Sequence, residues 1–166
     1  MNITETTKTS QWLLFVFTLP SGKASERVQV WRKLQKFGAI PFRNAGYLLP
    51  NSSENQERFE WAAKAVRSSS GEASLLEIAR VSDLSAAAVQ DLFRDARSPD
   101  FEELIEEMRA VKASADNGPA QILRFRKRLD EITGIDFFRS PLREKAETML
   151  TNLEWPQDVK TAPAKR

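Results

Sequence analysis

The sequence predicts an α+β protein in which a βαββαβ unit is followed by a helical C-terminal extension. An apolar, β-prone run at residues 12–17 leads into a basic amphipathic segment that ends at Gly38. Two short strand-like runs then flank a turn at 44–46, and a second amphipathic segment precedes another apolar run. From residue 82 onward the periodicity is helical only. This order of elements is that of a ferredoxin-like half-barrel.

The first strand and helix are predicted from residues 12–38. The run Trp12–Phe17 is continuously apolar, which favours a central strand buried on both faces, and Pro20 and Gly22 end it. A helix is expected from about Ser25 to Phe37, with Gly38 as its left-handed C-terminal residue. The inner stripe expected for this helix is Val28, Trp31, Leu34 and Phe37.

The other three strands and the second helix of the unit are predicted from similar signals. Strands are expected at 39–43 and 47–49, and Pro41 favours an edge position for the first of them. Ser52 or Ser53 is suited to cap the second helix, and the fourth strand is expected at about 72–81. Trp61 lies outside the expected buried stripe of the second helix, which is Phe59, Ala62, Ala63 and Val66.

The extension is expected to be helical throughout. Ser82-Asp83 is suited to cap a helix to about Ala96, and Ser98-Pro99 to start another. Gly118-Pro119 makes a turn before a basic helix, and Ser140-Pro141 starts the last helix. The expected core residues are Phe101, Leu104, Ile105, Met108, Ile122, Phe125, Leu129 and Ile132. The expected domains are a flexible arm (1–10), a ferredoxin-like domain (11–81), the helical extension (82–155) and a disordered tail (156–166).

Two absences from the 166 residues narrow the function. The sequence has no Cys and no His, which removes thiol chemistry, Ser-His triads and His-ligated metal sites. We therefore expect no enzyme, no catalytic residue, no metal and no cofactor. The acidic side chains that could in principle hold Mg²⁺ are strung along exposed helical positions without convergence: Asp91, Asp95, Glu102, Glu103, Glu106 and Glu107. No membrane span or signal peptide is predicted, and a cytoplasmic location is expected.

Charge is unevenly distributed, although the formal net charge is only +2. Lys and Arg are in excess over residues 1–67, the segment 83–107 is acidic, and 124–128 reads RFRKR. The first cationic group suits contacts with DNA phosphates, and its members are Lys23, Arg27, Arg32, Lys33, Lys36 and Arg43. The second group suits DNA phosphates or a small oxyanion, and its members are Arg124, Arg126, Lys127 and Arg128. The alternatives are an ordinary solvated helix face for the first group and salt bridges to the preceding acidic helix for the second.

Five segments, in order, resemble the N-terminal domain of the chromate-resistance protein ChrB. They are WLLFVFTLPSGKASERVQVWRKLQKFGA, GYLLPNSSENQERFEWAAKAV, GEASLLEIARV, DLFRDARSPDFEEL and RLDEITGIDFFRSPLREKAETML. The resemblance implies a cytoplasmic transcription regulator that binds the promoter of a chromate-resistance operon as a homodimer and responds to chromate. Members commonly carry a further C-terminal domain, which is not in this sequence. DNA binding is implied for the basic residues of matching segments.

Two other functions stay open at this point. One is an oxyanion (chromate) sensor or protein-interaction module without direct DNA contact. The other is a divergent metal-dependent nuclease, because the front half also resembles the ferredoxin-like CRISPR adaptation nuclease and the C-terminal region of the phenylacetate-pathway repressor. In that nuclease family an Asp follows the first strand, whereas this sequence reads Phe17-Thr18-Leu19-Pro20 there. A Thr hydroxyl is a poor Mg²⁺ ligand, which disfavours the nuclease.

Overall fold

The computed structural model of the chain describes residues 10–114 and 118–155. The expected tail (156–166) and nearly all of the expected arm (1–10) lie outside the described residues. The chain divides into two compact units, Met1–Leu92 and Phe93–Arg166. The predicted α+β class is confirmed. The division falls inside a helix, about ten residues after the predicted domain boundary.

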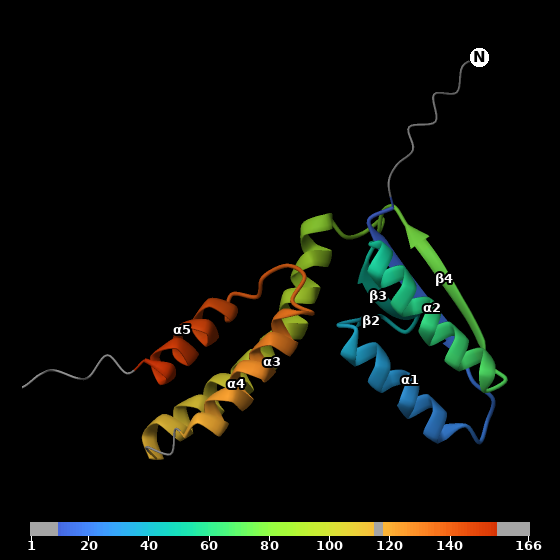
Figure 1. Cartoon of the computed structure of the whole chain (residues 1–166). Helices are drawn as coiled ribbons and strands as arrows, with labels where there is room; N and C mark the ends of the chain where they lie inside the picture. Colours follow the sequence, from blue (N-terminus) through green and yellow to red (C-terminus); the bar gives the residue numbers. More distant parts are fainter. Residues whose placement is uncertain (1–9, 115–117, 156–166) are drawn as a thin grey trace, which may run out of the picture. The chain divides into compact units, whose positions relative to one another are not determined.

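The first unit contains all of the strands (Figure 1). Its elements are β1 (Trp12–Thr18), α1 (Ala24–Lys36), β2 (Ile40–Phe42), β3 (Gly46–Pro50), α2 (Ser53–Ser68) and β4 (Glu72–Ile78). The sheet order is β2-β3-β1-β4, and every neighbouring pair is antiparallel. As predicted, β1 is central and β2, with Pro41, is at an edge. The fourth strand ends at Ile78 rather than near Val81.

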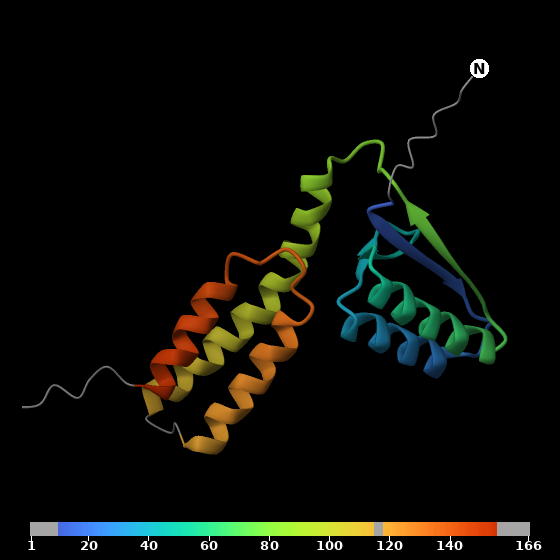
Figure 2. The same ribbon diagram turned by 45° about the horizontal axis from the view of Figure 1, so that its top comes forward.

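The core of this unit lies between β1 and α2. Leu13 and Phe15 of β1 are fully buried, and the Phe15 ring stacks on Phe59 of α2 with centroids 5.2 Å apart. Figure 2 shows α1 and α2 side by side on one face of the sheet. Trp12 and Leu14, which alternate with Leu13 and Phe15, are also buried. The central strand is therefore buried on both faces, as its uniformly apolar sequence predicts.

The end of α1 and the start of α2 lie where the sequence predicts them. Gly38 has a φ of 75° just after α1 and ends that helix. Ser52 caps α2, and its hydroxyl accepts a hydrogen bond from the Asn55 N–H at 3.2 Å. The predicted inner stripe of α2 is buried in full, while Trp61 is 68% exposed.

Gly46 lies where a side chain cannot fit. A Cβ at this position would be 2.2 Å from the Phe15 carbonyl oxygen and 2.9 Å from a Val16 methyl group. We expect Gly46→Ala to lower the free energy of unfolding by about 2 kcal/mol, because the backbones of β1 and β3 would have to separate. Gly118→Ala is the matched control, since nothing lies within 4 Å of a Cβ there. Urea unfolding followed by circular dichroism measures both, and equal stability of the two variants would contradict the prediction.

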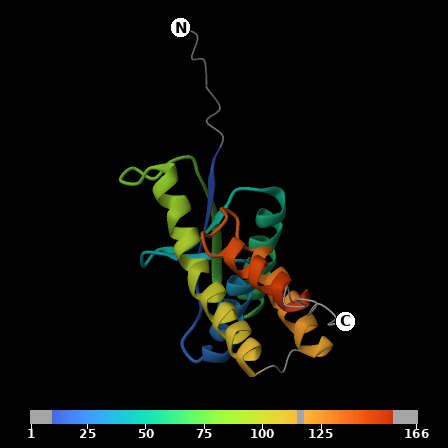
Figure 3. The ribbon, with the colours of Figure 1, turned by 90° about the vertical axis from the view of Figure 1, so that its left-hand side faces the viewer.

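Residues 86–114 form one helix, not the two that were predicted. Helix α3 (Ala86–Ser114) continues through Pro99 (Figure 3). Proline lacks the N–H that would bond to the Asp95 carbonyl four residues earlier, so α3 passes Pro99 without that hydrogen bond. The buried residues that follow Pro99 on α3 hold the helix by packing, which outweighs the local cost. The predicted cap at Ser82-Asp83 is also wrong, because the Ser85 hydroxyl accepts the Ala88 N–H at 3.1 Å.

The second unit is built from the part of α3 that follows Leu92, from α4 (Pro119–Thr133) and from α5 (Arg143–Glu154). Pro119 occupies the first turn of α4, where its missing N–H costs nothing. The predicted stripes of α3 and α4 are confirmed, with Ile122 partly buried at the margin. The buried core of this unit consists of Phe101, Leu104, Ile105, Met108, Phe125, Leu129, Ile132, Ala146, Leu150 and Leu153.

Candidate functional site

Helix α1 is rotated relative to the prediction. Val30 and Leu34 are its buried residues, whereas Val28 and Trp31 are 44% and 48% exposed. The sequence offers two overlapping apolar stripes, because Val28 and Trp31 are as well spaced with Leu34 as Val30 is. Packing selected the stripe that contains Val30, so the predicted inner positions of Val28 and Trp31 are wrong. The rotation determines which cations face outward.

Arg32, Lys33 and Lys36 form the cationic row of α1. All three are exposed. Within residues 10–114 and 118–155, no hydrogen bond or ion pair of their side chains is present. Arg32 and Lys36 are one turn apart on the face opposite Val30, and Lys33 is turned toward α2. These three side chains are therefore presented to solvent without an ion-pair partner among the described residues.

Lys23 and Arg27, at the start of the same helix, already have partners. The Lys23 ammonium lies 3.1 Å from the Glu26 carboxylate. Hydrogen bonds from the backbone of Glu26 itself, from the Ser25 hydroxyl and from Lys23 lower the pKa of this carboxyl. The Arg27 guanidinium donates a 3.3 Å hydrogen bond to the Leu19 carbonyl. Both cations stay near the surface but are less free than the cationic row.

Arg43, the last member of the first predicted group, is paired with Asp83. Its guanidinium donates to the Asp83 carboxylate, and this hydrogen bond lowers the pKa of Asp83. Both side chains are more than half exposed. Arg43 also has a positive φ of 52° in the turn after β2. Asp83 is thus an ion-pair partner rather than the helix cap that the sequence suggests.

A hollow of about 1050 Å³ lies beside Lys33 on the outer side of α2. Trp61 projects into solvent at this place. Both signs of charge line the hollow, so Lys33 has Glu57 and Glu60 in its neighbourhood, whereas Arg32 and Lys36 do not line it. The lining residues are Lys33, Glu57, Glu60, Trp61, Lys64, Ala65, Arg67 and Ser68.

The second predicted group, at 124–128, is largely engaged within its own unit. Arg128 donates to Glu107 and Glu103 at 2.6 Å each, and Arg126 pairs with Glu154. Burial alone would lower the pKa of Arg128, but the hydrogen bonds and charges of Glu107 and Glu103 outweigh it and raise that pKa. The acidic face of α3 thereby neutralises part of the basic face of α4.

Arg124 and Lys127 are the two members of this group without a carboxylate partner in the described part of the chain. Both are exposed, and the Arg124 guanidinium lies over the Phe125 ring at 5.7 Å. No group of three or more acidic side chains that could hold a metal ion is found in residues 10–114 and 118–155. Over the same ranges, no helix has the length and apolarity needed to cross a bilayer.

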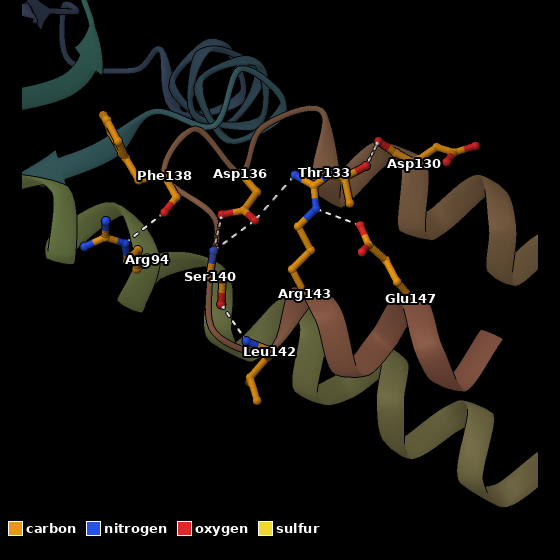
Figure 4. A network of polar contacts seen from close by, with 9 residues as sticks. All are labelled: Arg94, Asp130, Thr133, Asp136, Phe138, Ser140, Leu142, Arg143 and Glu147. Carbon is orange, nitrogen blue, oxygen red and sulfur yellow. Dashed lines mark hydrogen bonds and ion pairs between the residues drawn. The ribbon is translucent and has the colours of Figure 1, made fainter. Parts of the chain in front are cut away.

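Asp136 is a buried, hydrogen-bonded carboxylate that the sequence does not single out (Figure 4). Its side chain is 1% exposed, and both carboxylate oxygens accept from the Ser140 N–H, at 2.9 and 3.0 Å. Arg143 lies 4.0 Å from the carboxylate and bonds to Glu147 at 2.8 Å. The only signal in the sequence is an aspartate within an otherwise apolar segment, after Ile135. The carboxylate fixes the connection between α4 and α5 through its hydrogen bonds to the Ser140 backbone.

Together these features define a protein class: a ferredoxin-like unit with a row of exposed cations on one helix, followed in sequence by a helical unit with internal ion pairs. A sequence model of the family described as "Protein ChrB, N-terminal" matches residues 27–121, more than half of the chain. The chain therefore belongs to this family, and the predicted resemblance is confirmed.

A curated relative extends the match. The chain is 27% identical to Protein ChrB of Cupriavidus metallidurans (strain ATCC 43123 / DSM 2839 / NBRC 102507 / CH34) over 168 residues. The alignment covers 98% of this chain and 51% of that protein. The chain thus spans about half the length of this relative. No solved structure matches the chain.

Proposed function

We propose that this chain is a non-enzymatic, DNA-binding transcription regulator of chromate resistance. It binds the phosphates of duplex DNA with the cationic row of α1. The observation that carries the proposal is that Arg32, Lys33 and Lys36 are exposed and have no carboxylate partner among the described residues. Membership of the ChrB N-terminal family supports it. A DNA-binding regulator performs no catalytic step, so the cationic row needs no nucleophile or general base for this function.

The spacing of the row suits a phosphate backbone. Arg32 and Lys36 are separated by about 6 Å along the helix axis, at 1.5 Å per residue. One strand of B-DNA carries a charge every ~3.4 Å of axis. Because the strand winds around that axis, neighbouring phosphates are further apart in space than this rise, and the spacing of the two side chains suits neighbouring phosphates. Arg32 can bind a phosphate through two parallel hydrogen bonds, and the lysines act as point charges. Phosphate contacts fix position, and specificity then comes from few base edges or from DNA shape.

Lys23, Arg27 and Arg43 are proposed as secondary contacts. Their present partners are exposed or partly exposed groups: Glu26, the Leu19 carbonyl and Asp83. Exposed ion pairs of this kind contribute only about 0–1 kcal/mol. A nearby phosphate can therefore compete for these cations at small cost, so all six predicted residues remain in the proposed interface.

An oxyanion sensor built on residues 124–128 has less support. Arg126 and Arg128 are held by carboxylates, which leaves Arg124 and Lys127 for a ligand. A chromate dianion that also bound Arg128 would have to displace Glu107 and Glu103 from it. Calorimetry with chromate and with sulfate separates this function from DNA binding, because the DNA proposal needs no heat of binding for either anion.

The proposal predicts salt-dependent binding to promoter DNA. The three contacts of the cationic row alone give a slope of about −2.7 in a plot of log affinity against log salt, and the secondary contacts make it steeper. Raising the salt from about 50 to about 200 mM should then weaken binding by one protomer by at least about 40-fold. A mobility-shift titration against the chain's own promoter region measures this, with unrelated duplex as competitor. Failure to bind at the lower salt, or affinity that ignores salt, would overturn the proposal.

A further inference from the structure

Trp61 places an aromatic ring in the hollow beside the cationic row. Among the described residues of the first unit it is the most exposed large apolar side chain, at 68%. On α2 it lies opposite the buried stripe, in line with Glu57, Lys64 and Ser68 at spacings of four, three and four residues. Ligand sites are typically concave and combine aromatic side chains with a few polar groups. The hollow of about 1050 Å³ has this composition.

The charges of the hollow are sorted along α2. Glu57 and Glu60 precede Trp61, whereas Lys64 and Arg67 follow it. Over residues 10–114 and 118–155, the side chains of Glu57, Glu60 and Lys64 form no hydrogen bond or ion pair, although they line the same hollow. Arg67 donates to a backbone carbonyl at 3.0 Å and has no carboxylate partner there either. Cations therefore lie on one side of the indole along the helix, and carboxylates on the other.

A nucleotide matches this arrangement. The flat face of any base can stack on an indole ring, and the lysine ammonium groups attract phosphate oxygens. The carboxylates can accept hydrogen bonds from the amino group of a cytosine. An acidic or a basic peptide would meet attraction from only one half of these charges and repulsion from the other. Because Lys33 belongs both to the cationic row and to the hollow, a DNA strand that follows the row reaches the hollow at this residue.

We propose that the hollow takes up one unstacked base of the DNA strand that the cationic row binds, with the base on the Trp61 ring and adjoining phosphates on Lys33 and Lys64. This inference rests on the proposed function, because the row brings the strand to the hollow. Removing a base from a duplex costs free energy, least where the base is already unpaired. Stacking on an aromatic side chain raises affinity roughly tenfold. The chain therefore prefers DNA that contains an unpaired base to a continuous duplex.

A promoter duplex with one additional, unpaired cytosine near its centre tests the preference against the same duplex without it. Fluorescence-anisotropy titrations of the full chain should show about tenfold tighter binding to the bulged duplex. Trp61→Ala should remove this preference and change affinity for the continuous duplex by no more than about twofold, because no charge is lost and no base has to leave that duplex. Trp61→Phe keeps an aromatic ring and should retain most of the preference.

Two further variants make the test specific. Trp155→Ala is the control, since Trp155 is 73% exposed but belongs to the helical unit, and this variant should retain the full preference. Lys64→Gln should make the salt slope with the bulged duplex less steep by about 0.9. Free cytidine monophosphate at the concentration of the DNA should leave the preference unchanged. Loss of the preference in its presence would assign the hollow to a free nucleotide and overturn the proposal.

Equal affinity of the unmodified chain for the two duplexes would also overturn the proposal, as would a preference that survives Trp61→Ala. If the continuous duplex is still bound in a salt-dependent way in these cases, the proposed function stands without the base site. Failure of the proposed function itself gives a different result, in which neither duplex is bound at about 50 mM salt by any of these proteins.

Discussion

Replacement of Arg32, Lys33 and Lys36 together by glutamate should reduce affinity for promoter DNA at least 100-fold at about 50 mM salt. Three phosphate contacts are lost and three repulsive charges are introduced at the same place. The salt slope should also become less steep by about 2.7 for each protomer. Mobility-shift titrations at several salt concentrations measure both effects. The thermal unfolding midpoint should hardly change, because the three side chains are exposed and pair with no carboxylate in the described part of the chain.

A control with the same change in net charge makes this result specific. Arg124, Lys127 and Lys145 are exposed cations of the helical unit, and replacing them with glutamate also lowers the net charge by six. We expect this variant to lose no more than a few-fold in affinity, through the long-range field alone. Equal losses in the two variants would show that total charge, and not the cationic row of α1, governs DNA binding.

Asp136→Ala should give the largest loss of stability. The change removes the acceptor of the buried Ser140 N–H and leaves Arg143 without the carboxylate at 4.0 Å. An unsatisfied buried donor costs 1–3 kcal/mol, and more where the lost partner is charged. We expect the free energy of unfolding to fall by about 3 kcal/mol, which corresponds to about 15 °C in the midpoint for a unit of this size. Thermal unfolding followed by circular dichroism measures the shift.

Two milder variants show whether the carboxylate itself is responsible. Asp136→Asn keeps one oxygen acceptor and should lose clearly less stability than Asp136→Ala. Glu147→Gln changes the more exposed partner of Arg143, whose side chain is 40% exposed, and should change stability by no more than about 0.5 kcal/mol. An unfolding midpoint for Asp136→Ala equal to that of the unmodified chain would contradict the structural role assigned to this residue.

The sequence alone predicts most elements of the fold. The uninterrupted apolar run of β1 indicates a central strand, and the stripe of α2 from Phe59 to Val66 is buried as its period requires. Pro41 marks an edge strand because it cannot donate to a ladder. These signals are local, since each depends on side chains within one or two turns of each other. These signals fail where two apolar stripes on one helix are equally well spaced, as for Val28 and Val30 on α1. They also fail where tertiary packing keeps α3 helical through Pro99.

For the candidate site, the sequence by itself determined the residue types: no Cys or His, and cations concentrated on one helix and in the 124–128 cluster. Only the tertiary structure decided which of these charges are free. Arg43 meets Asp83 across 40 positions of the chain, and Arg128 meets Glu103 across 25. A charge is neutralised by its neighbour in space, and those neighbours are set by packing of the core. The same packing left Arg32, Lys33 and Lys36 exposed, together with Val28 and Trp31 beside them.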